Sequence, residues 1–249
     1  SEMCIRDSPY GSPSLEELCA GKKDIVIISS DHTRPVPSRV TMPILLHHIH
    51  SAAPEARVRI LVATGMHRPS THEELVNKYG EEIVANEEIV MHVATDDSMM
   101  KKIGTLPSGG ECIINKIAAD CDLLLAEGFI EPHFFAGFSG SRKSVLPGIA
   151  SYKTIMYNHN GQFVNDSHSR AGNLCHNHVS EDMFAAAEMA HLAFVLNVVL
   201  NGKHEVIGSF AGDIHKAHEA GCEFVKSLAG VEPVECEIAI TCLLYTSPS

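Results

Sequence analysis

Hydrophobic residues along the chain alternate between short continuous runs and longer segments with helical spacing. The run at residues 23–31, KDIVIISSD, is rich in β-branched side chains and stops at a polar turn, as buried strands of parallel sheets do. Further runs of this kind predict strands at residues 56–65, 88–97, 122–127, 192–201 and 236–241.

Segments with apolar residues three or four positions apart lie between these runs and predict helices. They cover residues 37–52, 70–80, 115–121, 180–191 and 211–230. Ser38 is the expected N-cap of the first helix, with Val40 and Leu45 on its buried face, and Ser70 and Glu73 have capping-box spacing in the second. Because strands alternate with helices, the sequence predicts an α/β domain with a mostly parallel, Rossmann-like sheet flanked by helices.

Composition narrows the class of protein. The 249 residues are 45% hydrophobic, enough for one large domain, and the formal net charge of −12 disfavours nucleic acid or an anionic membrane as the main partner. The chain shows no run of about 18 apolar residues and no secretory signal, so the cytoplasm is the expected location. Eight cysteines without a C-x-x-C pair indicate neither a zinc ribbon nor a disulfide framework.

Both ends of the chain lack the periodicity of their neighbours. Residues 1–14, SEMCIRDSPYGSPS, and residues 242–249, CLLYTSPS, resemble translated adapter sequence of the kind found in short metagenomic reads. We therefore expect a catalytic α/β domain over residues 15–241, flanked by non-native ends, in a chain that is a fragment.

Three polar loops follow predicted strands, and the carboxyl ends of parallel strands are where ligands collect. The first loop, SSDHTRPVPS (29–38), offers a carboxylate for sugar hydroxyls in Asp31 and a guanidinium for phosphate in Arg34, beside Thr33; a capped surface turn is the alternative. The second loop, ATGMHRPS (63–70), carries His67, which taken alone reads as a solvated histidine.

The third loop spans residues 127–144, EGFIEPHFFAGFSGSRKS, and brings a second loop histidine, His133. Two histidines on neighbouring loops are suited to act as opposed acid and base. The loop is not a Walker A motif, because Arg142 stands where that motif has a glycine before Lys-Ser. It is not a nucleophile elbow either, because Ser141 stands where G-x-S-x-G has its last glycine. A cation beside Lys143 favours nucleophilic or covalent chemistry there; a phosphate cradle of glycines and serines is an equal alternative.

The motifs DHTRPVPS, ATGMHRPS, EPHFFAGFSGSRKSVLPGIA and YNHN, in this order and spacing, resemble those of the nickel-dependent lactate racemase family. The resemblance covers roughly residues 20–241. It implies the N-terminal domain of a two-domain family that interconverts the stereoisomers of a 2-hydroxy acid by reversible hydride transfer. The implied cofactor is the nickel-pincer nucleotide, pyridinium-3,5-bisthiocarboxylic acid mononucleotide with Ni(II), and its assembly enzymes are implied partners.

The resemblance also implies roles for individual residues. Lys143 corresponds to the amine joined covalently to the cofactor, and His159 to the protein ligand of nickel. The acid and base correspond to His67 and His133. The remaining implied contacts to cofactor come from Asp31, Thr33, Arg34 and Ser144.

The sequence departs from the family after residue 241, where the Gly-Tyr-Pro signature and the second domain are absent. Two rival hypotheses remain beside the racemase. One is a phosphate- or nucleotide-binding module that uses the glycine-serine loop without redox chemistry, and the other is a serine hydrolase.

Overall fold

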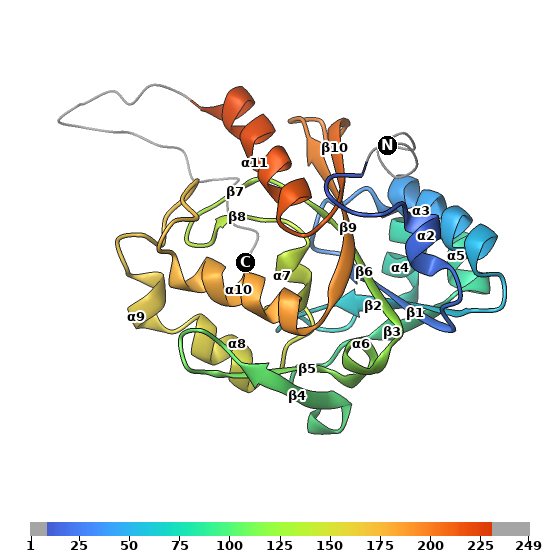
Figure 1. Ribbon diagram of the computed structural model, residues 1–249, viewed down its shortest axis with the longest axis horizontal. Helices are drawn as coiled ribbons and strands as arrows, with labels where there is room; N and C mark the ends of the chain where they lie inside the picture. The colour runs from blue at the N-terminus through green and yellow to red at the C-terminus, as the bar shows by residue number, and fades with distance from the viewer. Residues whose placement is uncertain (1–8, 231–249) are drawn as a thin grey trace.

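The computed structural model of the protein describes residues 9–230. A six-stranded sheet of order β10-β9-β6-β1-β2-β3 has helices on both faces (Figure 1). Its strands are β1 (Asp24–Ser30), β2 (Arg57–Ala63), β3 (Glu88–Met91), β6 (Leu123–Phe129), β9 (Leu192–Leu200) and β10 (Val206–Gly212). Every neighbouring pair is parallel except β10 with β9. The predicted α/β class with a mostly parallel sheet is confirmed.

Two hydrophobic cores lie on the two faces of the sheet. In β1, Ile25 and Ile27 face one core while Val26 and Ile28 face the other, which explains its continuous apolar run. The first core is covered by α2 (Leu15–Cys19), α3 (Ser38–Ala52), α4 (His72–Tyr79) and α5 (Glu81–Asn86). The second is covered by α6 (Lys116–Asp120), α7 (Arg142–Val145), α8 (Tyr152–Asn158), α10 (His178–Met189) and α11 (Lys216–Ala229), with α9 (Gly161–Val164) beside α10.

Three details of the predicted helices are wrong. Ser38 is the first residue of α3 rather than its N-cap, because its hydroxyl donates to a buried carboxylate, that of Glu127. Val40 is 54% exposed, because the buried face of α3 runs through Ser38, Thr41, Met42 and Leu45 and leaves Val40 on the outer side. In α4 the capping box is formed by Thr71 and Glu74, one residue beyond the predicted pair of Ser70 and Glu73.

The hydrophobic pattern also missed three pairings. The edge strand β10 alternates apolar residues with glycine and serine and buries only its last residues, so it lacks the run that marks the central strands. The hairpins β4 (Met100–Thr105) with β5 (Glu111–Asn115), and β7 (Pro132–His133) with β8 (Gly137–Phe138), lie outside the main sheet, and η1 (Asp97–Met99) precedes β4. The strand predicted at 236–241 lies outside the described residues.

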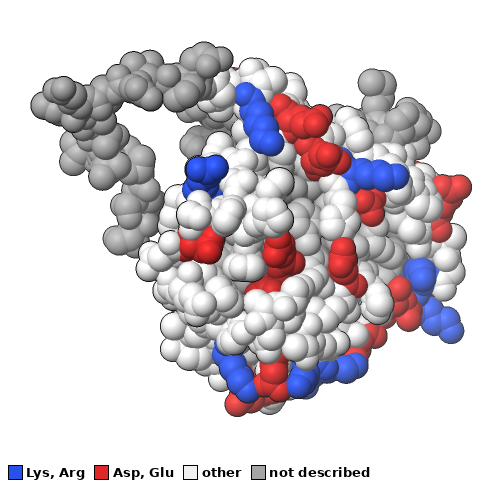
Figure 2. Space-filling view, turned by 60° about the vertical axis from the view of Figure 1, so that its left-hand side comes forward, with Lys and Arg blue, Asp and Glu red and all other residues white. Residues whose placement is uncertain are grey.

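The start of the described chain is bonded to the rest of the domain. The Tyr10 backbone amide donates to Ala211, and the Ser14 side chain caps α2, so this segment is joined to the fold. Over the face in Figure 2, basic side chains lie singly among acidic ones. Across residues 9–230, no helix has the length and apolarity that crossing a bilayer requires.

Candidate active site

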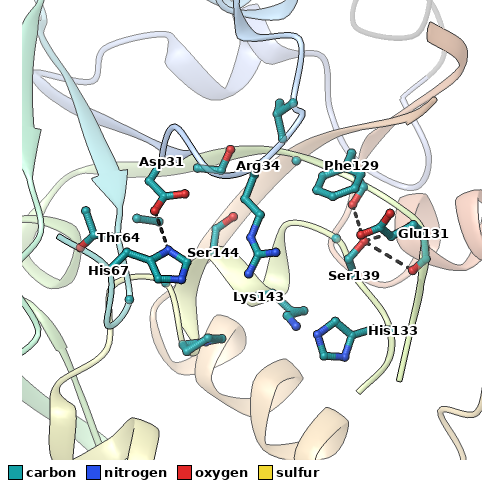
Figure 3. Close-up of a pocket in the computed structure, with 18 of the residues that line it drawn as sticks. Asp31, Arg34, Thr64, His67, Phe129, Glu131, His133, Ser139, Lys143 and Ser144 are labelled. Carbon is teal, nitrogen blue, oxygen red and sulfur yellow. Dashed lines mark hydrogen bonds and ion pairs between the residues drawn. The ribbon is translucent and has the colours of Figure 1, made fainter. Parts of the chain in front are cut away.

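The loops after β1, β2 and β6 enclose a pocket of about 530 Å³, completed by α7 and the end of α8 (Figure 3). The predicted site residues that line it are Asp31, Arg34, His67, His133, Lys143, Ser144 and His159. Thr33 is exposed and does not line the pocket, but its hydroxyl donates to Asp31. The structure therefore brings to one place the residues that the sequence distributes over three loops and a helix end.

One side of the pocket holds a histidine against a buried carboxylate. His67 Nδ1 lies 2.7 Å from Asp31 Oδ2, and Asp31 Oδ1 accepts the Thr33 hydroxyl at 2.7 Å. The Asp31 side chain is buried, whereas that of His67 is 45% exposed. Because a carboxylate only accepts, Nδ1 of His67 carries a hydrogen, and in the neutral ring Nε2 is the nitrogen with the free lone pair. Asp31 thus orients His67, a role that the sequence did not indicate.

The opposite side holds His133 in the other tautomer. Its Nδ1 accepts the amide hydrogen of Ala136 at 3.2 Å, so the neutral ring carries its hydrogen on Nε2. The ring stacks on Phe134, with centroids 4.7 Å apart. Burial, followed by the positive charges of Lys143 and Arg34, lowers the pKa of His133 to about 3. His133 is therefore neutral at physiological pH and presents an N–H group.

Lys143 lies in the single turn of α7, between these two histidines in Figure 3. Burial lowers the pKa of its amine to about 7, with further lowering by the neighbouring charges of Arg142 and Arg34 and a raising effect from Glu131. A large fraction of this amine is neutral at pH 7, which is the form that acts as a nucleophile. The leading cause of this lowered pKa is burial, with the neighbouring cation that the sequence pointed to in second place.

His159 closes the pocket at the carboxyl end of α8. Its Nδ1 is buried and has no hydrogen-bond partner among the described residues. Burial, followed by the charge of Lys143, lowers the pKa of this imidazole to about 4. A neutral imidazole with an unpaired buried nitrogen is uncommon in proteins. The lone pair of such a nitrogen is suited to bind an electrophile such as a metal ion.

One aromatic ring contacts three of the candidate residues and was missed by sequence reasoning. Phe135 lies edge-on to His133 at 4.6 Å and to His159 at 5.2 Å between centroids, and Lys143 Nζ lies 5.8 Å from its centroid. Its motif contains three phenylalanines, and the sequence does not distinguish them. Phe134 is 75% exposed and Phe138 is buried, so only Phe135 takes this central position.

The third loop faces the pocket only in part, so the phosphate cradle that the sequence left open as an alternative is incomplete. Ser139, Gly140 and Ser144 line the pocket, whereas other atoms of the loop pack within the protein. A Cβ atom on Gly137 would lie 2.2 Å from the Asn173 carbonyl oxygen, and one on Gly140 would lie 2.6 Å from the His218 ring. The Ser139 hydroxyl donates to the Phe129 carbonyl and that of Ser141 to the Asn197 side chain. These residues pack and bond within the protein.

Of two further charged residues beside the pocket, sequence reasoning missed Glu127 and expected Arg142 in the wrong place. Glu127 is fully buried at its floor and accepts hydrogen bonds from the hydroxyls of Ser29, Ser38 and Thr41. Its only sequence signal is an acidic residue inside the apolar run LLLAEGF. Arg142, which the sequence pairs with Lys143 as a ligand-binding cation, is 1% exposed and is absent from the pocket lining.

The fold and the pocket together define an α/β ligand-binding domain whose site is equipped for proton transfer. A sequence profile described as the lactate racemase N-terminal domain matches residues 5–172. The chain therefore belongs to the lactate racemase family.

Relatives and solved structures agree with this membership. The chain is 68% identical over 235 residues to a lactate racemase of Lactiplantibacillus plantarum and 52% identical over 235 residues to that of Thermoanaerobacterium thermosaccharolyticum, in each case covering 94% of this chain and 55% of the relative. The solved lactate racemase apoprotein from the latter organism superimposes with a TM-score of 0.89 at 52% identity, over 90% of this chain and 54% of that one.

A Thermotoga maritima protein shares the fold at 22% identity, with a TM-score of 0.74 over 91% of this chain and 59% of that one. The chain thus spans about half the length of the curated relatives it matches.

Proposed function

We propose that this chain forms the cofactor-binding half of an isomerase that racemises or epimerises a small 2-hydroxy acid resembling lactate. The observation that carries the proposal is the pocket, where two histidines in opposite tautomers flank a lysine of lowered pKa. The names of the curated relatives support the same reaction class.

The residues present fit the nickel-pincer nucleotide that the family resemblance implies. The unpaired buried nitrogen of His159 is the nickel ligand in this proposal, and the amine of Lys143 is the covalent anchor. Among residues 9–230, no group of three His, Cys, Asp or Glu side chains is placed to hold a metal ion. One imidazole suits a nickel ion whose sulfur donors come with the cofactor.

When bound, this cofactor supplies a reversible hydride acceptor for the α-carbon of the substrate. The histidines handle the hydroxyl proton. His67 Nε2 accepts that proton, because Asp31 holds the hydrogen of the ring on Nδ1. The Nε2–H group of His133 donates a hydrogen bond to the same substrate oxygen from the other side. Arg34 supplies a guanidinium between them for an anionic group.

The two enantiomers use these histidines in exchanged roles. For His133 to accept a proton at Nε2, its hydrogen must move to Nδ1, and Nδ1 must release the Ala136 amide. His67 needs no such change. The resting pocket is therefore set for the enantiomer whose hydroxyl faces His67.

A cytoplasmic location and the cofactor-assembly enzymes as partners belong to the same proposal, and family membership supports them. The rival hypotheses are weaker. The hydroxyls of Ser139 and Ser141 bond within the protein, which disfavours a phosphate cradle. Within residues 9–230, none of Ser139, Ser141 and Ser144 bonds a histidine through its hydroxyl, which disfavours a serine hydrolase.

Co-expression with cofactor-assembly enzymes, followed by intact-mass and metal analysis, tests the proposal. We expect a covalent adduct and about one nickel per chain in the wild type. Lys143→Ala should abolish the adduct, whereas His159→Ala should keep the adduct and lose most of the nickel. A wild-type chain without adduct, or an adduct that persists in Lys143→Ala, would contradict it.

A further inference from the structure

Arg142 is the residue that the sequence singled out and the pocket does not use. Its side chain is among the largest that are fully buried, and its guanidinium lies 4.6 Å from the centroid of the Phe184 ring in α10. It donates hydrogen bonds of 3.0–3.2 Å to backbone carbonyls of the third loop, those of Ala136, Phe138 and Ser139. The guanidinium therefore holds closed the turn that carries His133 at its start and Lys143 at its end.

The same guanidinium ties this turn to two helices. It donates to the Ser180 hydroxyl in α10 at 3.2 Å, and its Nη1 lies 2.7 Å from His218 Nε2 in α11. His218 Nε2 also lies 2.8 Å from the Ser139 carbonyl oxygen, the same oxygen that accepts from Arg142, and its Nδ1 lies 3.5 Å from Cys222 Sγ. Burial, followed by the charge of Arg142, lowers the pKa of His218 well below its usual range.

The charge of Arg142 has no carboxylate to balance it among the described residues. Within residues 9–230 the guanidinium forms no ion pair, and its polar contacts are with carbonyls, a hydroxyl and the His218 imidazole. Burial lowers the pKa of Arg142 to about 10, which still leaves it charged at pH 7. A buried unbalanced charge is unfavourable in itself, so its presence next to Lys143 calls for an explanation.

We propose that Arg142 is a positioning residue with two effects: it closes the turn between His133 and Lys143, and its unbalanced charge keeps the Lys143 amine neutral. Nearby positive charge disfavours a second cation in a poorly hydrated site. The other groups that act on the amine are Arg34, with the same sign of effect, and Glu131, with the opposite sign. The neutral imidazoles of His133 and His159 complete its surroundings.

This inference rests on the proposed function only for the use of the amine, and it is tested on the chain without cofactor. The measurement is the rate of acetylation of Lys143 by a pulse of acetic anhydride as a function of pH. Peptide mass spectrometry reads the rate relative to the exposed Lys203 in the same sample. In the wild type we expect a midpoint near pH 7, from the pKa of about 7.

A matched pair of variants at His218 separates charge from packing. His218→Glu places a carboxylate against the guanidinium and should raise the midpoint for Lys143 by about one pH unit. His218→Gln is neutral and of similar size, so it should leave the midpoint unchanged. Equal midpoints in both variants would overturn the inference, because a merely structural role of Arg142 predicts no dependence on the charge at position 218.

Variants of Arg142 itself give a second, independent reading. Arg142→Met removes the charge and should raise the midpoint by about one pH unit, whereas Arg142→Lys keeps the charge and should leave it near the wild-type value. Equal shifts in these two variants would show that loosening of the turn, not charge, acts on Lys143, and would overturn the electrostatic part. Failure of any of these tests leaves the nickel and adduct experiment unaffected, so the two proposals fail separately.

Discussion

The two walls of the pocket hold their histidines by different physical means. On the carboxylate wall, formed by Asp31, Thr33 and His67 above Glu127, the two buried carboxylates accept hydrogen bonds from the neighbouring side chains. On the cation wall, formed by His133, Lys143 and His159 above Arg142, no described carboxylate accepts a hydrogen bond from any of the four side chains. One wall fixes protonation through partners, and the other fixes it through burial and like charge.

The difference has a chemical consequence. A hydrogen-bonded carboxylate sets the tautomer of a histidine, so His67 offers the nitrogen opposite to Asp31. Burial disfavours the charged form of a base, so His133, Lys143 and His159 are kept as electron-pair donors. This arrangement suits a site in which His67 accepts a proton on one side while Lys143 and His159 bind an electrophilic group on the other.

The largest expected effect comes from removing the carboxylate beneath the carboxylate wall. Glu127→Ala leaves the hydroxyls of Ser29, Ser38 and Thr41 without their acceptor inside the protein and should lower the free energy of unfolding by about 3 kcal/mol. Glu127→Gln keeps one acceptor oxygen and should lower it by about half as much. Urea denaturation followed by circular dichroism measures both. Equal stability of all three proteins would break the comparison.

An intermediate effect is expected from acid on the cation wall. His218 has a lowered pKa in the folded chain, so below about pH 6.5 the unfolded chain binds a proton that the folded chain does not. His133 and His159, with pKa values of about 3 and 4, act in the same direction. Stability is therefore fully present above pH 6.5 and is lost as the pH falls toward 4.

The measurement is the urea midpoint at pH 7 and at pH 5. We expect a loss of about 1 kcal/mol per pH unit from the fully buried His218 alone. His218→Gln should flatten the pH dependence by that amount while leaving the contributions of His133 and His159. A wild-type chain as stable at pH 5 as at pH 7 would refute the burial account of this wall.

The smallest effect on stability, and the sharpest on the comparison, concerns ring tautomers. In nitrogen-labelled protein at pH 7.5, NMR should show His67 with hydrogen on Nδ1 and His133 with hydrogen on Nε2. Asp31→Ala should move the His67 hydrogen to Nε2, leave His133 unchanged and cost about 1 kcal/mol. If His67 already carries its hydrogen on Nε2 in the wild type, Asp31 does not orient it.

Much of the site could be predicted from the sequence because its residues sit in short polar loops directly after apolar runs. His67 and His133 were recognisable for that reason, and Lys143 because a cation precedes it. What failed was local detail that depends on distant partners. The Ser38 hydroxyl bonds Glu127 instead of capping α3, and the Ser139 hydroxyl of the third loop bonds the Phe129 carbonyl.

The sequence by itself determined the α/β class, the order of the central strands along the chain and the three polar loops that surround the pocket, since periodicity and loop position are local properties. Only the tertiary structure decided the partners. Asp31 meets His67 across 36 positions, Arg142 meets His218 across 76, and Thr41 meets Glu127 across 86. The first pair forms because the sheet aligns the carboxyl ends of separate strands, and the other two form because helices pack onto that sheet and onto each other. A pattern along one chain does not encode which side chains then face each other.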